Sequence, residues 1–128
     1  MNAFKLIFIS ALSSLTLANG ATAAPGAQAS PCFLNRNING FSAPNDRTVY
    51  VRVGVKDVWR LDLMNDCTGL SFRNSFGLQG SPTGPWICRP LDATVIVSQT
   101  GIRQRCPVSA LRRLTPEEVA ALPKRDRP

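Results

Sequence analysis

The sequence contains no histidine and few carboxylates. Histidine is the usual general base for serine and cysteine nucleophiles and a frequent metal ligand, so its absence excludes histidine-dependent hydrolases and histidine-ligated metal sites. Of the eight acidic residues, Glu117 and Glu118 are accounted for by a predicted helix start. We therefore predict a non-enzymatic protein that requires no metal and no cofactor. The alternative, an enzyme using Asp62 or Asp92, requires these two carboxylates to share one cleft.

The sequence also lacks a closely spaced pair of cysteines. A zinc site and a redox-active Cys-x-x-Cys dithiol both need such a pair, so the four cysteines are predicted to form two structural disulfides. Four cysteines allow three pairings, and the sequence does not choose among them. We prefer nested bridges, Cys67 with Cys88 and Cys32 with Cys106, since the outer bridge would join the start of the domain to its last strand.

The N-terminal apolar run, Leu6 to Leu17, is shorter than the roughly 20 residues needed to cross a bilayer. It follows Lys5 and precedes the small-residue pattern Ala21-Thr22-Ala23, as in a secretory signal peptide cleaved near Ala23. An N-terminal membrane anchor is the alternative, which the short run disfavours. We therefore predict a periplasmic or secreted protein without a transmembrane segment.

Four segments follow from composition. Residues 1–23 are the predicted signal peptide, and residues 24–31, with small residues and two prolines, are a predicted disordered leader. Residues 32–122 are predicted to form a single β-rich domain, followed by a loose basic tail over residues 123–128.

The clearest regular pattern lies between Arg47 and Cys67. Apolar residues there alternate with mostly polar ones in two runs, interrupted at Gly54 to Asp57, which predicts an antiparallel hairpin with one face on the core. The inward residues are Val49, Val51, Val53, Trp59, Leu61 and Leu63.

A second hairpin is predicted farther along the chain. Alternation from Leu91 to Val97 predicts one strand, and Ile102 to Val108 returns as its partner with Cys106 facing inward. Ala43 to Asp46 is predicted to be a turn, and Gly77 to Pro85 the longest loop. The sequence thus predicts a small disulfide-stapled antiparallel barrel or curled sheet of five or six strands, with one short C-terminal helix.

That helix has a strong start signal. Thr115 is a predicted N-cap, Pro116 occupies the first helical position, and Glu118 is the reciprocal partner of a capping box. Leu114 and Val119 complete a hydrophobic staple. A helix of about two turns is too short to be stable alone, so we expect it to dock on the sheet.

The chain is basic, with fifteen basic residues against eight acidic ones and a formal charge of +7. Twelve of the basic residues are arginines, whose planar fork suits phosphates and carboxylates, so we predict an anionic envelope component or an envelope protein as partner, and no nucleic acid. A basic surface that only aids solubility is the alternative. The candidate binding residues are Arg103, Arg105, Arg112, Arg113 and Trp86; the tryptophan is either an interface anchor or a core residue.

Six short motifs characterise the chain between Cys32 and Leu122. They are Cys32-Phe33, the run from Asn45 to Val51, Leu61-Asp62-Leu63 before Cys67, Cys88 with Leu91-Asp92, the run from Arg105 to Val108, and the run from Leu114 to Glu118. Together they resemble a group of small exported proteobacterial proteins of unknown function. The resemblance implies an envelope location and a compact β-rich domain, and it carries over no catalytic residues.

The first functional hypothesis is a periplasmic or secreted binding module whose arginine-rich C-terminal quarter faces its partner. The alternative is an inhibitor of an envelope-active enzyme, which would insert the loop from Gly77 to Pro85. Salt separates the two hypotheses, because a contact led by charge weakens steeply with ionic strength and a loop inserted in a cleft does not.

Overall fold

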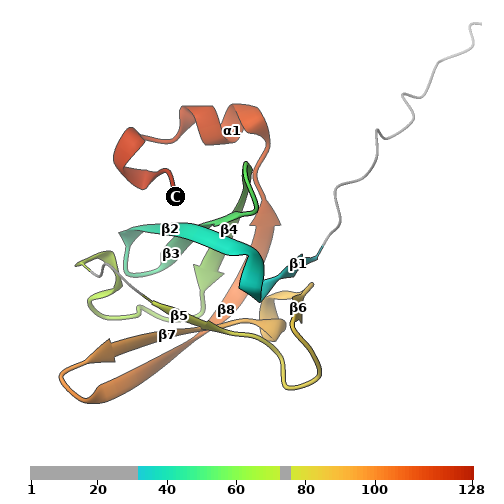
Figure 1. Ribbon diagram of the computed structural model, residues 1–128. Coiled ribbons are helices and arrows are strands. Elements are labelled where there is room, and N and C mark those ends of the chain that lie inside the picture. The colour runs from blue at the N-terminus through green and yellow to red at the C-terminus, as the bar shows by residue number, and fades with distance from the viewer. Residues whose placement is uncertain (1–31, 73–75) are drawn as a thin grey trace, which may run out of the picture.

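The computed structural model describes residues 32–72 and 76–128, so the predicted signal peptide and leader lie outside the described residues (Figure 1). The strands are β1 (Phe33–Leu34), β2 (Ile38–Asn45), β3 (Thr48–Val53), β4 (Asp57–Leu63), β5 (Gly77–Gln79), β6 (Trp86–Ile87), β7 (Thr94–Gln99) and β8 (Ile102–Arg113). The α-helix is α1 (Pro116–Ala121), and four 3₁₀ turns are η1 (Asn35–Asn37), η2 (Leu70–Phe72), η3 (Pro90–Asp92) and η4 (Lys124–Asp126).

Six strands form one antiparallel sheet in the order β2-β3-β4-β8-β7-β5, and β1 pairs with β6 in a separate two-stranded sheet. The large sheet curls into a half-barrel, with α1 outside it (Figure 1). The predicted class, a disulfide-stapled curled antiparallel sheet with one short C-terminal helix, is confirmed.

The predicted hairpin from Arg47 to Cys67 is β3 and β4. Val49 lies opposite Leu61 and Val51 opposite Trp59, and these four side chains are buried. The apolar residues that alternate in the sequence therefore form the inner face of the half-barrel, as predicted.

The second predicted hairpin is β7 and β8, but β8 continues five residues beyond Val108. Its first half pairs with β7 through Pro107, and its second half pairs with β4. Leu63 lies opposite Val108 and Asp62 opposite Ala110, so Ser109 is an extra residue on β8. This β-bulge shifts the alternation by one position, which hid the second half of the strand from a period-two reading.

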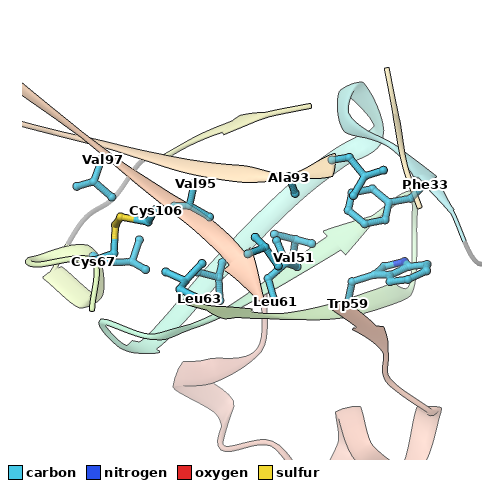
Figure 2. Packing of buried hydrophobic residues seen from close by; sticks show 14 of the residues in the cluster. Phe33, Val51, Trp59, Leu61, Leu63, Cys67, Ala93, Val95, Val97 and Cys106 are labelled. Carbon is cyan, nitrogen blue, oxygen red and sulfur yellow. A yellow bond between two sulfur atoms is a disulfide. The ribbon is translucent and has the colours of Figure 1, made fainter. Parts of the chain in front are cut away.

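The hydrophobic core fills the inside of the half-barrel (Figure 2). Strands β3, β4, β7 and β8 each contribute inward side chains. The two ends are closed by Phe33, whose ring lies 5.0 Å from that of Trp59, and by Leu70 of η2.

The disulfides join Cys32 to Cys88 and Cys67 to Cys106, so the predicted nested pairing was wrong. Cys67 lies just past β4 and Cys106 lies on β8, which is the neighbour of β4 in the sheet. Cys32 precedes β1 and Cys88 follows β6, which pair with each other. Each bridge therefore follows strand adjacency, which cysteine spacing does not encode.

Three local predictions were also wrong. Ala43 and Pro44 belong to β2, and the turn is formed later, where Asn45 Oδ1 accepts hydrogen bonds from the N–H groups of Arg47 and Thr48. The first three residues of the predicted loop from Gly77 to Pro85 form β5. Leu91, placed in a strand by its alternation, lies exposed in η3 because Pro90 starts a 3₁₀ turn there.

The C-terminal helix begins as predicted, with a capping box between Thr115 and Glu118. The residues after it are not a loose tail. They form η4 and turn back to the sheet, where Ser42 donates to the carbonyl of Asp126 and Arg52 donates to that of Pro128 at 3.2 Å. Arg127 donates to the carbonyls of Leu122 and Ala120. These carbonyls lie at the end of the helix, where no further helical N–H group is available to them.

Candidate binding surface

The outer face of the half-barrel has two unlike parts. We call the outer face of β2, β3, β4 and residues 110–113 of β8 the covered face, since α1 and η4 lie over it (Figure 1). Tyr50, Val58 and Leu114 are buried there, with Val119 and Leu122 packed against them. The outer face of β5, β7 and residues 102–107 of β8 is the bare face.

Two arginines of the covered face, Arg60 and Arg112, have carboxylate partners. Arg60 donates through Nε to both carboxylate oxygens of Asp62, at 3.0 and 3.1 Å, and this hydrogen bonding raises the pKa of the Arg60 guanidinium. Arg112 pairs with Glu118 of α1 at 2.6 Å. The pKa of Glu118 is lowered, first by the N–H of Thr115 and then by Arg112. Arg112 therefore has a structural partner and holds the helix start on the sheet.

Arg113 and Trp86, two of the predicted binding residues, lie together at one end of the half-barrel. Arg113 pairs with Asp57 at 2.5 Å, and the pair lines a hollow of about 180 Å³ with Trp86. Trp86 is 51% exposed, while its neighbour Ile87 is fully buried, so Ile87 fills the core and the tryptophan does not. The alternative that Trp86 is a core residue is therefore wrong, and its role as an interface anchor stays a prediction.

Arg103 and Arg105 lie together on the bare face, away from the other candidates. The strand register explains this position: Cys106 faces the core, so Arg103 and Arg105 point outward, opposite Ser98 and Ile96 of β7. Arg105 donates to Gln79 Oε1 at 2.6 Å, and Arg103 borders a shallow hollow of about 340 Å³. Among the described residues, neither arginine forms an ion pair. Both are exposed and available to a partner.

The sequence around the bare face contains almost no negative charge. Asp92 is the sole acidic residue between Asp66 and Glu117. Asp92 caps η3, where the N–H groups of Arg89 and Cys88 lower its pKa. The four candidate arginines are therefore divided among three places in the structure, and the pair Arg103 and Arg105 has no carboxylate partner among the described residues.

The two carboxylates of the catalytic alternative, Asp62 and Asp92, do not line the same hollow. Asp62 lines an open polar hollow of about 1190 Å³ with Asp46 and Ser109, and Asp92 is not among the residues that line it. Asp46 accepts hydrogen bonds from the N–H of Ser71, from the N–H of Gly69 and from the Ser71 hydroxyl, and the first of these is the main cause of its lowered pKa. Asp46 therefore serves as a hydrogen-bond acceptor that holds residues 69–71.

No group of three or more metal-ligating side chains lies together in residues 32–72 and 76–128. Over the same ranges, no helix is both long and apolar enough to cross a membrane.

Two exposed apolar residues near the β7–β8 turn were missed by the sequence reasoning. Ile102 is 70% exposed at the β7–β8 turn, although its alternation with Cys106 placed it on the inward side. Phe72 of η2 is 88% exposed. Ile102 directly follows Thr100-Gly101, and this position at the tip of a hairpin was the signal that could have identified it.

A family model described as "Family of unknown function (DUF6491)" matches residues 3–128, and the chain belongs to this family. Searches of curated proteins and of solved structures each found no match.

Proposed function

We propose that this member of a family of unknown function is an exported, non-enzymatic binding module whose bare face contacts an anionic partner. The observation that carries the proposal is that Arg103 and Arg105 project from the bare face without an ion pair to any described carboxylate. The covered face, by contrast, pairs Arg60 and Arg112 with carboxylates. An arginine fork suits the paired oxygens of phosphate, sulfate and carboxylate groups.

Export is supported by two independent features. The N-terminal residues have the charge, apolar run and small-residue pattern of a secretory signal. All four cysteines form disulfides, which persist in oxidising compartments such as the bacterial periplasm. The resemblance to small exported proteobacterial proteins supports the same location.

The test is binding of a soluble polyanion, heparin, to the oxidised protein purified after export. Two phosphate-like contacts predict that the affinity falls about tenfold between about 50 and 200 mM salt. Arg103→Gln/Arg105→Gln is expected to lose most of this salt dependence together with the affinity. Fluorescence anisotropy of labelled heparin measures both quantities.

The matched control is Lys124→Gln/Arg125→Gln, which removes the same number of charges from η4. Both residues are exposed. Equal losses in the two double variants would show that net charge alone drives binding, and would overturn the assignment to the bare face. Absence of heparin binding at low salt would overturn the proposal itself.

A second candidate function is favoured by the exposure of Trp86. Tryptophan and arginine are the residues most enriched in interface hot spots, and Trp86 shares its hollow with the Asp57–Arg113 pair. The adjacent segment from Gly80 to Pro85 forms a tight turn in which the N–H of Gly84 donates to the carbonyl of Ser81. A protein partner, including an envelope enzyme that this turn would inhibit, fits this end of the molecule.

Affinity capture from periplasmic extract tests the second candidate. A single protein that is retained equally at low and physiological salt, and lost with Trp86→Ala, is the expected result. Val55→Ala is the control, since Val55 is 94% exposed at the β3–β4 turn. Retention that is lost at physiological salt, or that survives Trp86→Ala, would contradict a protein contact at this end.

A further inference from the structure

We infer that the anionic partner is a lipid surface, which the protein meets with the tip of the β7–β8 hairpin and with η2. This inference rests on the proposed function, because it identifies the anionic partner of Arg103 and Arg105 on the bare face. It adds an apolar contribution that a soluble glycan would not require.

The hairpin tip is a tight turn that ends on an exposed apolar side chain. Thr100 and Gly101 both have positive φ, 44° and 82°, as in the two-residue turns that match the twist of paired strands. Ile102 follows immediately and lies opposite Gln99. The turn itself requires no apolar residue after Gly101, and the Ile102 side chain is 70% exposed.

The turn η2 is fixed beside this hairpin. Gly69 lies beside the side chain of Gln99, and a Cβ on Gly69 would be in ordinary van der Waals contact with Gln99 Oε1, at 3.5 Å. Gln104 donates to the carbonyl of Asp66 at 3.4 Å, and the Cys67–Cys106 disulfide lies next to this bond. The turn η2, which carries Phe72, is therefore held at the same end of the molecule as the hairpin turn.

Positive charge lies directly behind the apolar tip. Arg103 and Arg105 follow Ile102 on β8, and the residues from Thr68 to Leu91 and from Ala93 to Pro116 include no acidic residue. Exposed apolar side chains flanked by unpaired basic residues are the combination by which proteins bind anionic membrane interfaces. Charge complementarity and the two apolar residues together specify a bilayer with anionic headgroups.

The experiment is sedimentation of the oxidised protein, purified after export, with vesicles of equimolar phosphatidylglycerol and phosphatidylcholine. Ile102→Ser/Phe72→Ser is expected to weaken partitioning by about tenfold or more, since it removes the apolar contact. Arg103→Gln/Arg105→Gln is expected to weaken it by about 30-fold, from the contribution of each basic residue at an anionic surface. Val55→Ser, at the opposite end, is the matched control and should bind as the unmodified protein does.

Insertion of the tip is measured separately. Ile102→Trp places a fluorophore at the hairpin, and brominated lipid tails should quench it. Val55→Trp should show no added quenching above the two native tryptophans.

The outcomes separate this inference from the proposed function. Arginine-dependent heparin binding without vesicle binding, or with vesicle binding unaffected by Ile102→Ser/Phe72→Ser, would overturn the lipid inference and leave the proposed function standing. Equal binding to pure phosphatidylcholine would also overturn it. Absence of both heparin and vesicle binding would overturn both.

Discussion

The covered face and the bare face belong to one sheet, and β8 runs through both. Each half of β8 carries two arginines. In the second half, Arg112 pairs with Glu118 of α1, and Arg113 pairs with Asp57 at the start of β4. In the first half, Arg103 and Arg105 have no carboxylate within reach among the described residues. The comparison shows that arginines clustered in a sequence do not by themselves define a binding surface. Carboxylates from distant segments decide which arginines remain available to a binding partner.

The largest effect on stability should come from removing the Cys67–Cys106 disulfide, which joins the end of β4 to the first half of β8. In the chain-entropy model, Cys67→Ala/Cys106→Ala costs about 4 kcal/mol of unfolding free energy, measured by urea denaturation. Cys32→Ala/Cys88→Ala should cost a similar entropic amount, but without the added loss of buried core sulfur, since Cys88 is exposed. A smaller loss of unfolding free energy for Cys67→Ala/Cys106→Ala than for Cys32→Ala/Cys88→Ala would show that the Cys67–Cys106 disulfide does not hold β4 and β8 together.

The next largest effect on stability should come from truncating an apolar residue under the helix, compared with truncating one at the exposed hairpin turn. Leu114→Ala removes a buried side chain between α1 and the sheet, and should cost about 2 to 3 kcal/mol in the same denaturation experiment. Ile102→Ala, on the exposed tip, should change stability by less than about 0.5 kcal/mol. A large loss for Ile102→Ala would mean that Ile102 packs in the fold and is not free to contact a partner.

Acid should loosen the turn that carries Phe72. The pKa of Asp46 is lowered in the folded protein, so its contribution to stability is complete above the unfolded value, near 3.8, and is lost as the pH falls through the lower folded value. Asp46→Asn should remove this pH dependence and cost about 1 to 2 kcal/mol at neutral pH, since it weakens several hydrogen bonds. Urea denaturation of both proteins at neutral and acidic pH tests this; parallel pH profiles would contradict it.

The smallest effect should separate paired from unpaired arginines. Arg112→Gln should lose about 0.5 kcal/mol of unfolding free energy with its partly exposed ion pair to Glu118. Arg103→Gln should lose none, because no ion pair is broken. Thermal denaturation of the two variants at low salt gives the comparison, and a greater loss for Arg103→Gln would contradict the division of the sheet into two faces.

Local signals predicted the fold well wherever the deciding interactions are local. The β3–β4 hairpin follows from alternation, and the start of α1 follows from Thr115, Pro116 and Glu118. The sequence could not predict the disulfide pairing, because strand adjacency is set by the whole sheet. It could not predict the second half of β8 either, because Ser109 breaks the alternation.

The sequence identified candidate residues for the binding surface, but it did not predict which of them lie together in the fold. Arg103, Arg105 and Trp86 were identified, but Arg112 was included with them although Glu118 pairs with it. That pairing depends on where α1 docks, which is a tertiary outcome. Ile102 was assigned to the inward side because period-two reasoning does not register that a strand end lies beyond the core.

The bulge at Ser109 also determines where the length of this chain can change. Strand β8 has one residue more than β4 requires at this point, since Asp62 and Leu63 lie opposite Ala110 and Val108. A chain that lost Ser109 would keep every one of these partners, whereas loss of any residue between Gln104 and Pro107 would turn one side of the strand over and place arginine in the core. Among relatives of this protein, single-residue deletions in β8 should therefore be found at the bulge and not before it.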